Sequence, residues 1–194
     1  MKKLTSKDLI NIGIFTAIYI ALVVVASGTA IVPIMQFVFV PIAALITAPV
    51  YLLYIAKVGK FGAILITGLL SSGLVGFLVY GNIYCFLVNI AFFIIAEFIA
   101  YAGKYKSKKL NNLSFIVCSF WAMGEAGLPW TAREYFWQLS VDSGYSVDWA
   151  NGVNALATPT TLVLMLAGIA ICAIIGIMYS NSLFKKHFKK AGII

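Results

Sequence analysis

The sequence predicts an all-α integral membrane protein, a bundle of six transmembrane helices in a single membrane domain over residues 1–194. The first observation behind this prediction is composition: 62% of the residues are apolar, 10% are charged, and the mean hydropathy is +1.01. A soluble domain carries about 25% charged residues, which cover its surface. A soluble enzyme, a disordered chain and a disulfide scaffold are therefore excluded as classes.

The second observation is the placement of the lysines. They form four short clusters, at positions 2, 3 and 7, at 57 and 60, at 104, 106, 108 and 109, and at 185, 186, 189 and 190. The clusters bracket three apolar blocks, 8–56, 61–103 and 110–184, and each block has room for two helices of about 20 apolar residues. Each block is therefore predicted to be a helical hairpin, and the net charge of +8 is explained by topology and not by nucleic acid binding.

In chain order, the helices are expected at about 9–29, 34–56, 61–79, 83–103, 113–130 and 154–180. Pro33 separates the first two helices, and residues 80–82 separate the third from the fourth. The polar stretch 131–153 is predicted to be an external loop. The aromatic residues of this stretch, together with Trp130 just before it, suit a membrane–water interface or a cap over an outward-facing pocket. Those within the stretch are Tyr135, Trp137, Tyr145 and Trp149.

This arrangement puts every lysine on one side of the membrane. Cytoplasmic loops carry the excess of lysine and arginine, so that side is assigned to the cytoplasm together with both termini. Arg133, Glu134, Asp142 and Asp148 remain outside. A cleaved signal peptide is the alternative for the N-terminus, because the apolar run 9–26 precedes the small-residue segment 26–30. Cleavage would leave five spans and an external N-terminus.

Two stripes of small residues run along predicted helices. Gly13, Ala17 and Ala21 recur at every fourth position of the first helix, and Gly168, Cys172 and Gly176 do so in the last. Such spacing lets helix backbones approach closely in lipid. Each stripe therefore serves either packing within the bundle or docking on another membrane protein.

Two carboxylates lie at membrane depth, where an ionisable group needs a partner, a cavity or a function. Glu97 lies two helical turns before Lys104 and is expected to pair with it or reach the cytoplasmic end. Glu125 lies between Trp121 and Trp130, so we expect it to bind a nitrogen-containing ring by hydrogen bonding and stacking. The alternative for Glu125 is contact with the outer interface or with Arg133.

Further polar side chains at a similar depth in the outer half come from the fourth to sixth predicted spans and the external loop. Together they would line one small outward-facing pocket, whereas individually each suits a helix cap or an interhelical hydrogen bond. The candidates are Asn82, Tyr84, Asn89, Arg133, Tyr135, Asn151, Asn154 and Thr158.

No pattern in the sequence predicts catalysis, a metal or a cofactor. A phosphate-binding loop and a His-Glu-x-x-His motif are both missing. Cys85, Cys118 and Cys172 share no metal-binding or redox spacing, and the single histidine, His187, belongs to the basic C-terminal segment.

Particular segments resemble a known family. Residues 3–17, KLTSKDLINIGIFTA, and residues 183–193, LFKKHFKKAGI, are similar to the Trep-Strep family of putative S components. Ala17-x-x-x-Ala21 on the first helix, together with six spans, resembles the substrate-binding S components of energy-coupling-factor (ECF) transporters. Arg133 and Tyr135 lie where the family is expected to carry an Arg-x-x-Tyr-like segment, with one residue fewer between them here.

The resemblance implies a subunit of the bacterial plasma membrane that binds a vitamin or vitamin precursor on the outside. It would dock through Ala17 and Ala21 on a membrane-embedded T component driven by two cytoplasmic ATPases, and topple in the membrane to release substrate. Two other functions stay open from the residues: a small structural or assembly protein, and an autonomous secondary transporter with Glu125 or Glu97 as a proton site.

Overall fold

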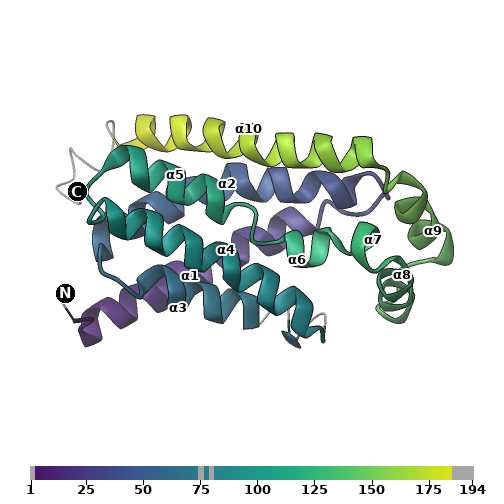
Figure 1. Cartoon of the computed structure of the whole chain (residues 1–194), viewed down its shortest axis with the longest axis horizontal. Coiled ribbons are helices and arrows are strands. Elements are labelled where there is room, and N and C mark those ends of the chain that lie inside the picture. The colour runs from purple at the N-terminus through teal and green to yellow at the C-terminus, as the bar shows by residue number, and fades with distance from the viewer. Residues whose placement is uncertain (1–2, 74–76, 79–80, 185–194) are drawn as a thin grey trace.

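The computed structural model describes residues 3–73, 77–78 and 81–184, and within these ranges it contains α-helices and no strand (Figure 1). In chain order the helices are α1 (Ser6–Ser27), α2 (Met35–Val58), α3 (Ala63–Ser72), α4 (Ile83–Ala102), α5 (Lys108–Cys118), α6 (Met123–Ala126), α7 (Leu128–Thr131), α8 (Arg133–Asp142), α9 (Val147–Leu156) and α10 (Pro159–Leu183).

Four of these helices, α1, α2, α4 and α10, are long and apolar enough to cross a membrane. They correspond to the first, second, fourth and sixth predicted spans. α3 is apolar but has only 10 residues, and part of the predicted span 61–79 lies outside the described residues. The six-span prediction is therefore confirmed for four helices only.

The fifth predicted span, 113–130, is not one continuous helix. α5 ends at Cys118, and α6 and α7 follow as two helices of four residues each. Gly124 and Gly127 are weak helix formers, and Pro129 has no N–H to donate. Gly124 also approaches α4 so closely that a Cβ there would meet Asn89 Oδ1 at 2.3 Å.

The predicted external loop, 131–153, is mostly helical. It holds α8 and α9, joined by a short turn at residues 143–146. Ser146 caps α9 by accepting a hydrogen bond from Trp149 N. The predicted loop is therefore helical over most of its length.

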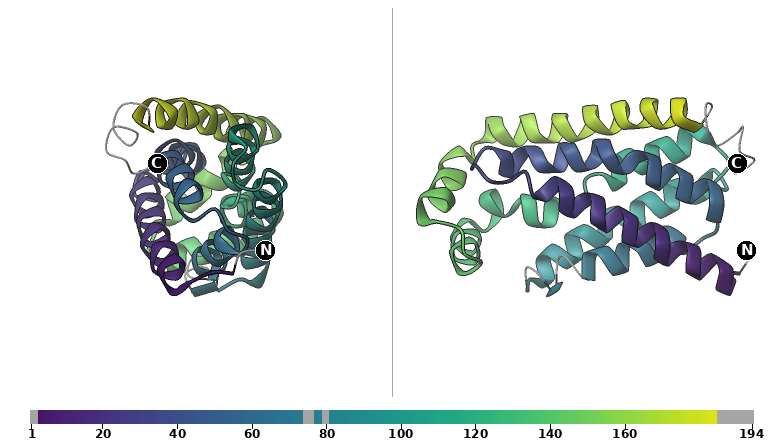
Figure 2. Two further views of the ribbon diagram at one scale, coloured as in Figure 1. Left: turned by 90° about the vertical axis from the view of Figure 1, so that its left-hand side faces the viewer. Right: turned by 180° about the vertical axis from the view of Figure 1, so that it is seen from behind.

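The helix ends that carry the described lysines lie together. The start of α1 and the α2–α3 and α4–α5 connections gather at one end of the bundle, and α7, α8 and α9 lie at the other (Figures 1 and 2). The described lysines before residue 110 therefore share one end, as predicted. The fourth cluster and His187 lie outside the described residues.

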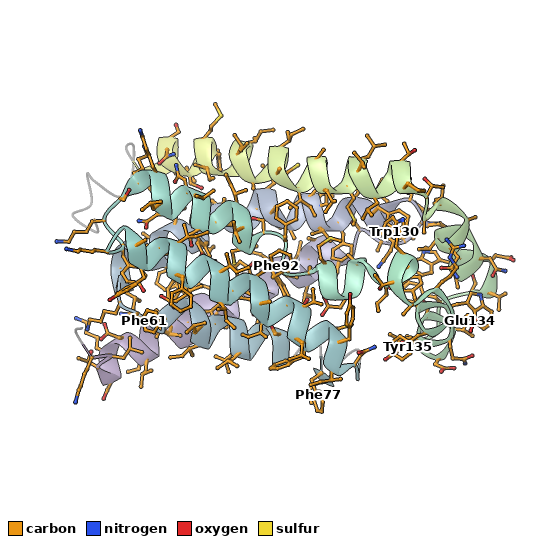
Figure 3. All side chains as sticks on the ribbon, in the orientation of Figure 1. Phe61, Phe77, Phe92, Trp130, Glu134 and Tyr135 are labelled. Atoms are coloured by element: carbon orange, nitrogen blue, oxygen red, sulfur yellow. The ribbon has the colours of Figure 1, made fainter. Side chains whose placement is uncertain are left out.

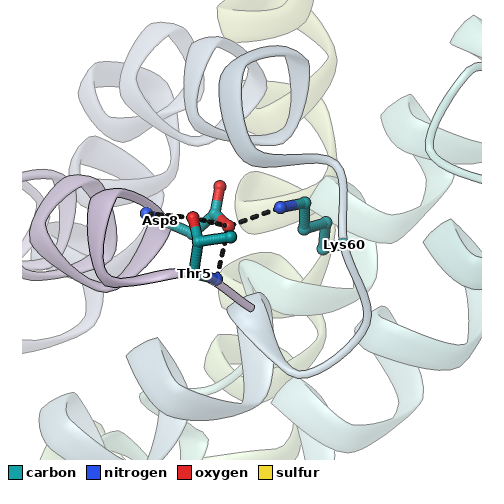
Figure 4. Close-up of polar contacts among 3 residues, drawn as sticks. All are labelled: Thr5, Asp8 and Lys60. Atoms are coloured by element: carbon teal, nitrogen blue, oxygen red, sulfur yellow. Dashed lines mark hydrogen bonds and ion pairs between the residues drawn. The ribbon is translucent and has the colours of Figure 1, made fainter. Parts of the chain in front are cut away.

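A polar contact holds the lysine-bearing end together (Figure 4). Thr5 and Asp8 form a reciprocal capping box at the start of α1. The same Asp8 carboxylate forms an ion pair with Lys60 at 2.5 Å, which ties α1 to the α2–α3 connection. Gly59 and Gly62 flank Lys60 with φ angles of 49° and 93°, which favour glycine.

α2 is the central helix of the bundle. In its apolar window 61% is buried inside the protein, against 28–33% in α1, α4 and α10. α10 packs along one side of α2 through its small residues: a Cβ at Gly168 would meet Pro41, and one at Gly176 would meet Ala48 and the Leu45 carbonyl. The stripe on α10 therefore serves internal packing.

The stripe on α1 lies on a different kind of surface. The buried side of α1 is formed by Ile12, Thr16, Tyr19, Val23 and Ala26. Gly13, Ala17 and Ala21 are exposed, and a Cβ built on Gly13 would meet nothing within 4 Å. Packing within the chain therefore does not use this stripe.

Candidate functional site

The first candidate site surrounds Glu125, which is only 2% exposed. Its Oε1 accepts a hydrogen bond from Asn89 Nδ2 at 2.5 Å, and Asn89 Oδ1 accepts one from Gly124 N at 3.1 Å. Cys85 Sγ donates to Gly124 O. These hydrogen bonds join α4 to α6. Glu125 Oε2 is buried without a hydrogen-bond partner among the described residues.

Trp121 belongs to the core beneath this site. It is 3% exposed, and its ring lies 6.3 Å from that of Tyr19 and 5.7 Å from that of Phe93. Neither Trp121 nor Glu125 lines a described cavity. The structure therefore places these two residues inside the bundle and away from the cavity described below.

Three other candidates cap or connect helices. Asn82 caps α4 by accepting from Tyr84 N at 2.8 Å. Thr158 and Thr161 form the capping box of α10. Asn151 Oδ1 accepts from Trp137 Nε1 at 2.8 Å, which joins α9 to α8. These residues match the capping and interhelical alternatives of the sequence interpretation.

The remaining candidates lie around α8 and α9. Arg133 donates to the carbonyls of Pro129 and Ala157, at 3.4 and 3.2 Å, and so links α7 to the end of α9. Asn154 Oδ1 is buried without a partner in the described part of the chain. Tyr84 on α4 and Tyr135 on α8 are exposed. Figure 3 shows Tyr135 and Glu134 at the end that carries α8.

Glu97 has partners other than the predicted Lys104. Its carboxylate is fully buried and accepts hydrogen bonds from Gly62 N at 3.2 Å and Leu65 N at 3.1 Å, at the N-terminus of α3. Tyr105 donates its hydroxyl to the other oxygen. Burial raises the pKa of Tyr105 above its ordinary value, and the bond to Glu97 raises this pKa further. Glu97 is thus a helix-capping group, because free N–H groups at a helix start favour a carboxylate.

A cavity of about 250 Å³ lies at the end of the bundle opposite the described lysines. It is lined by the α1–α2 connection, the start of α2, α8, the α8–α9 turn and α9. A more open hollow of about 380 Å³ adjoins it and shares Ser27, Ala30, Tyr145 and Trp149. The lining residues of the cavity are Ser27, Ala30, Gln36, Phe39, Phe136, Leu139, Ser140, Ser143, Tyr145 and Trp149.

The sequence candidates for ligand binding do not line this cavity. Of the aromatic residues in the predicted loop, Tyr145 and Trp149 do. The other lining residues come from two segments that are far apart in the sequence, 27–39 and 136–143, and no local signal marks Gln36 or Ser140. Among the residues that the structure describes, no cluster of His, Cys, Asp or Glu suits a metal ion.

The fold and the cavity define a class: a helical integral membrane protein with a partly open cavity at the end of the bundle away from its described lysines. Residues 6–190 match a family model described as "hypothetical bacterial integral membrane protein (Trep_Strep)". The chain belongs to this family and is a bacterial integral membrane protein, which confirms the family part of the resemblance. No curated protein and no solved structure matches the chain.

Proposed function

We propose that the chain is the substrate-binding S subunit of an ECF-type importer of a vitamin or vitamin precursor. It binds a small molecule in the cavity beneath α8 and α9, docks on a T component in the membrane, and performs no chemistry of its own. Two cytoplasmic ATPases supply the energy. The observation that carries this proposal is the cavity of about 250 Å³ at one end of a bundle of membrane helices.

The orientation of the bundle supports uptake from outside. Lys3, Lys7, Lys57, Lys60 and the cluster at 104–109 lie at the end opposite the cavity. The positive-inside rule assigns that end to the cytoplasm. The cavity then faces the outside, where an importer meets its substrate.

The exposed stripe on α1 supports docking. Gly13, Ala17 and Ala21 leave a shallow surface along a membrane helix, whereas the comparable stripe on α10 is occupied by α2. Small side chains allow a second helix to approach closely, and van der Waals contact then drives association in lipid. A T component is the partner that the proposed function requires at this surface.

Glu125 supports a second candidate function, a proton-coupled secondary transporter. A buried carboxylate with one oxygen that has no partner among the described residues is a suitable proton site inside a membrane protein. In that case Glu125→Gln would abolish uptake, and uptake would need no ATPase. An S subunit instead retains ATP-driven uptake in this variant, because Glu125 lines neither cavity at that end.

The experiment for the proposed function uses the full chain. The purified protein is analysed by mass spectrometry for a small molecule that co-purifies, and uptake of that molecule is measured in cells with and without the ATPase subunits. Saturable binding and ATPase-dependent uptake support an S subunit. A chain that binds no small molecule would be a structural or assembly protein, and uptake without ATPases would indicate a secondary transporter.

A further inference from the structure

The lining of the cavity carries no charge. None of its ten side chains is Asp, Glu, Lys, Arg or His. The charged residues of α8 and α9, Arg133, Glu134, Asp142 and Asp148, are all exposed on the surface. A charged ligand would lose its hydration inside the cavity without gaining a counter-charge, and that loss is costly. The lining therefore selects against both anions and cations.

Gln36 supplies a side-chain amide to the wall of the cavity. It is 6% exposed and lines the cavity, and its side-chain amide has no hydrogen-bond partner in the part of the chain that the structure describes. A ligand that displaces water from this amide has to replace the hydrogen bonds that the water made. Because the amide has both N–H donors and a carbonyl acceptor, a group with a donor next to an acceptor satisfies it best.

Two serines add acceptors to the wall. Ser140 Oγ donates to Phe136 O at 2.7 Å, and Ser27 Oγ donates to Val24 O at 2.9 Å. Because each hydroxyl has used its single proton, both oxygens present lone pairs only. A ligand N–H has acceptors here, whereas an anionic oxygen would face them unfavourably.

The aromatic residues define the shape of the ligand. Tyr145 stacks on Trp149 with ring centroids 4.2 Å apart, and the Phe136 ring lies 6.2 Å from that of Trp149. Aromatic walls favour flat rings, which stack on them. The volume of about 250 Å³ lies below the range of about 300–1,000 Å³ typical of drug-sized ligands. The space suits a compact ring without a long tail.

We propose that the cavity binds an uncharged, flat ring molecule that bears a carboxamide or lactam, held by reciprocal hydrogen bonds to Gln36 and by stacking within the aromatic wall. This substrate class rests on the proposed function, which makes the cavity the binding site. It goes further by excluding carboxylate, phosphate and ammonium compounds of similar shape.

Three probes of nearly equal shape test the charge and the amide. Benzamide is neutral, benzoate is an anion and benzylamine is a cation at neutral pH. Binding to the full chain in detergent is measured by ligand-observed NMR titration. We expect saturable binding of benzamide, with benzoate and benzylamine at least about tenfold weaker, because neither charge finds a partner in the lining. Equal or tighter binding of a charged probe, or no binding of benzamide, would overturn the inference.

Variants of Gln36 locate the binding. Gln36→Met keeps the length of the side chain, removes its hydrogen bonds and should weaken benzamide about tenfold or more. Gln36→Glu should shift the preference to benzylamine. The matched control is Gln138→Met on the exposed side of α8, where the amide bonds Asp142 at 2.8 Å, and benzamide affinity should not change. Unchanged affinity in Gln36→Met would show that the probe binds elsewhere.

The proposed function can fail separately. Co-purification with the T component and the ATPases is measured without any probe. Selective benzamide binding by a chain that never joins such a complex would retain the substrate class and refute the S subunit. If the chain joins the complex but prefers benzoate, the S subunit would be supported and the proposed substrate class would be refuted.

Discussion

Glu125 and Asn89 form a buried polar pair, and their importance for folding can be tested. Asn89 donates to Glu125 and accepts from Gly124 N, so Asn89→Ala leaves both groups without a partner. An unsatisfied buried group costs about 1–3 kcal/mol, and more when charged. Thermal unfolding in detergent should show Asn89→Ala destabilised by about 3 kcal/mol or more.

Glu125→Gln is the comparison for this pair. It keeps an acceptor for Asn89 and replaces a buried ionisable group with a neutral amide of the same shape, so stability should equal or exceed that of the native chain. A large loss of stability in Glu125→Gln with none in Asn89→Ala would show that the carboxylate depends on other partners.

Tyr105 allows a second test at the level of one atom. Its hydroxyl donates to the buried Glu97 carboxylate, whereas no hydrogen bond of the nearby Tyr101 hydroxyl is seen within the described chain. Bonds to charged groups contribute about 1.5–3 kcal/mol. Tyr105→Phe should lower the free energy of unfolding by that amount, and the matched variant Tyr101→Phe should change it by less than about 0.5 kcal/mol. If the two substitutions changed the free energy of unfolding equally, the Tyr105 hydroxyl would not stabilise Glu97, and only the N–H groups at the start of α3 would do so.

At the level of elements, the two small-residue stripes give opposite predictions for one substitution. Gly176→Ala puts a Cβ within 2.8 Å of Ala48 and of the Leu45 carbonyl, so it should destabilise the α2–α10 contact by about 1–3 kcal/mol. In Gly13→Ala the added Cβ has no neighbour within 4 Å, and a glycine is removed from a helix interior. The substitution should therefore leave the protein's stability unchanged or raise it by about 0.5–1 kcal/mol. Unfolding of both variants in detergent checks the pair, and a loss of stability in Gly13→Ala would place that face inside the bundle.

The sequence predicts the long helices well and the short ones poorly. Runs of about 20 apolar residues define α1, α2, α4 and α10, because only a helix satisfies the backbone of such a run in lipid. The segment 113–130 is also mostly apolar, yet α5 ends at Cys118. The close contact of Gly124 with Asn89 is tertiary, so hydropathy does not reveal it.

The candidate site was only partly predictable for a related reason. Asn89 and Glu125 stand out because polar residues are rare at membrane depth, and they do meet. The cavity combines Gln36 with Ser140 and Trp149, which are polar or aromatic residues of ordinary kinds in distant segments. Their proximity depends on how α8 and α9 fold back over the α1–α2 connection, and no periodicity encodes this.

The topology of the whole molecule gives the fourth prediction. Single cysteines at Lys106 and Asp142, in a chain whose native cysteines are replaced, should be labelled from opposite sides of the membrane in intact cells. The α4–α5 connection and the end of α8 lie at opposite ends of the bundle (Figure 1). A membrane-impermeant reagent should reach position 142 from outside and not position 106. Labelling of both positions from one side would contradict this orientation.

The central claim concerns a subunit that docks through α1. Ala17→Trp and Ala21→Trp place a large ring on the exposed stripe, and Ala167→Trp places the same ring on the exposed side of α10 as a control. All three substitutions are at exposed positions, so the unfolding temperature should stay near that of the native chain.

Co-purification of each variant with the T component and the two ATPases tests this claim most directly. A tryptophan at position 17 or 21 would prevent a partner helix from packing closely on the small residues of α1. We expect Ala17→Trp and Ala21→Trp to lose the complex and Ala167→Trp to retain it. Retention of the full complex by all three variants, or its loss only in Ala167→Trp, would contradict docking through α1.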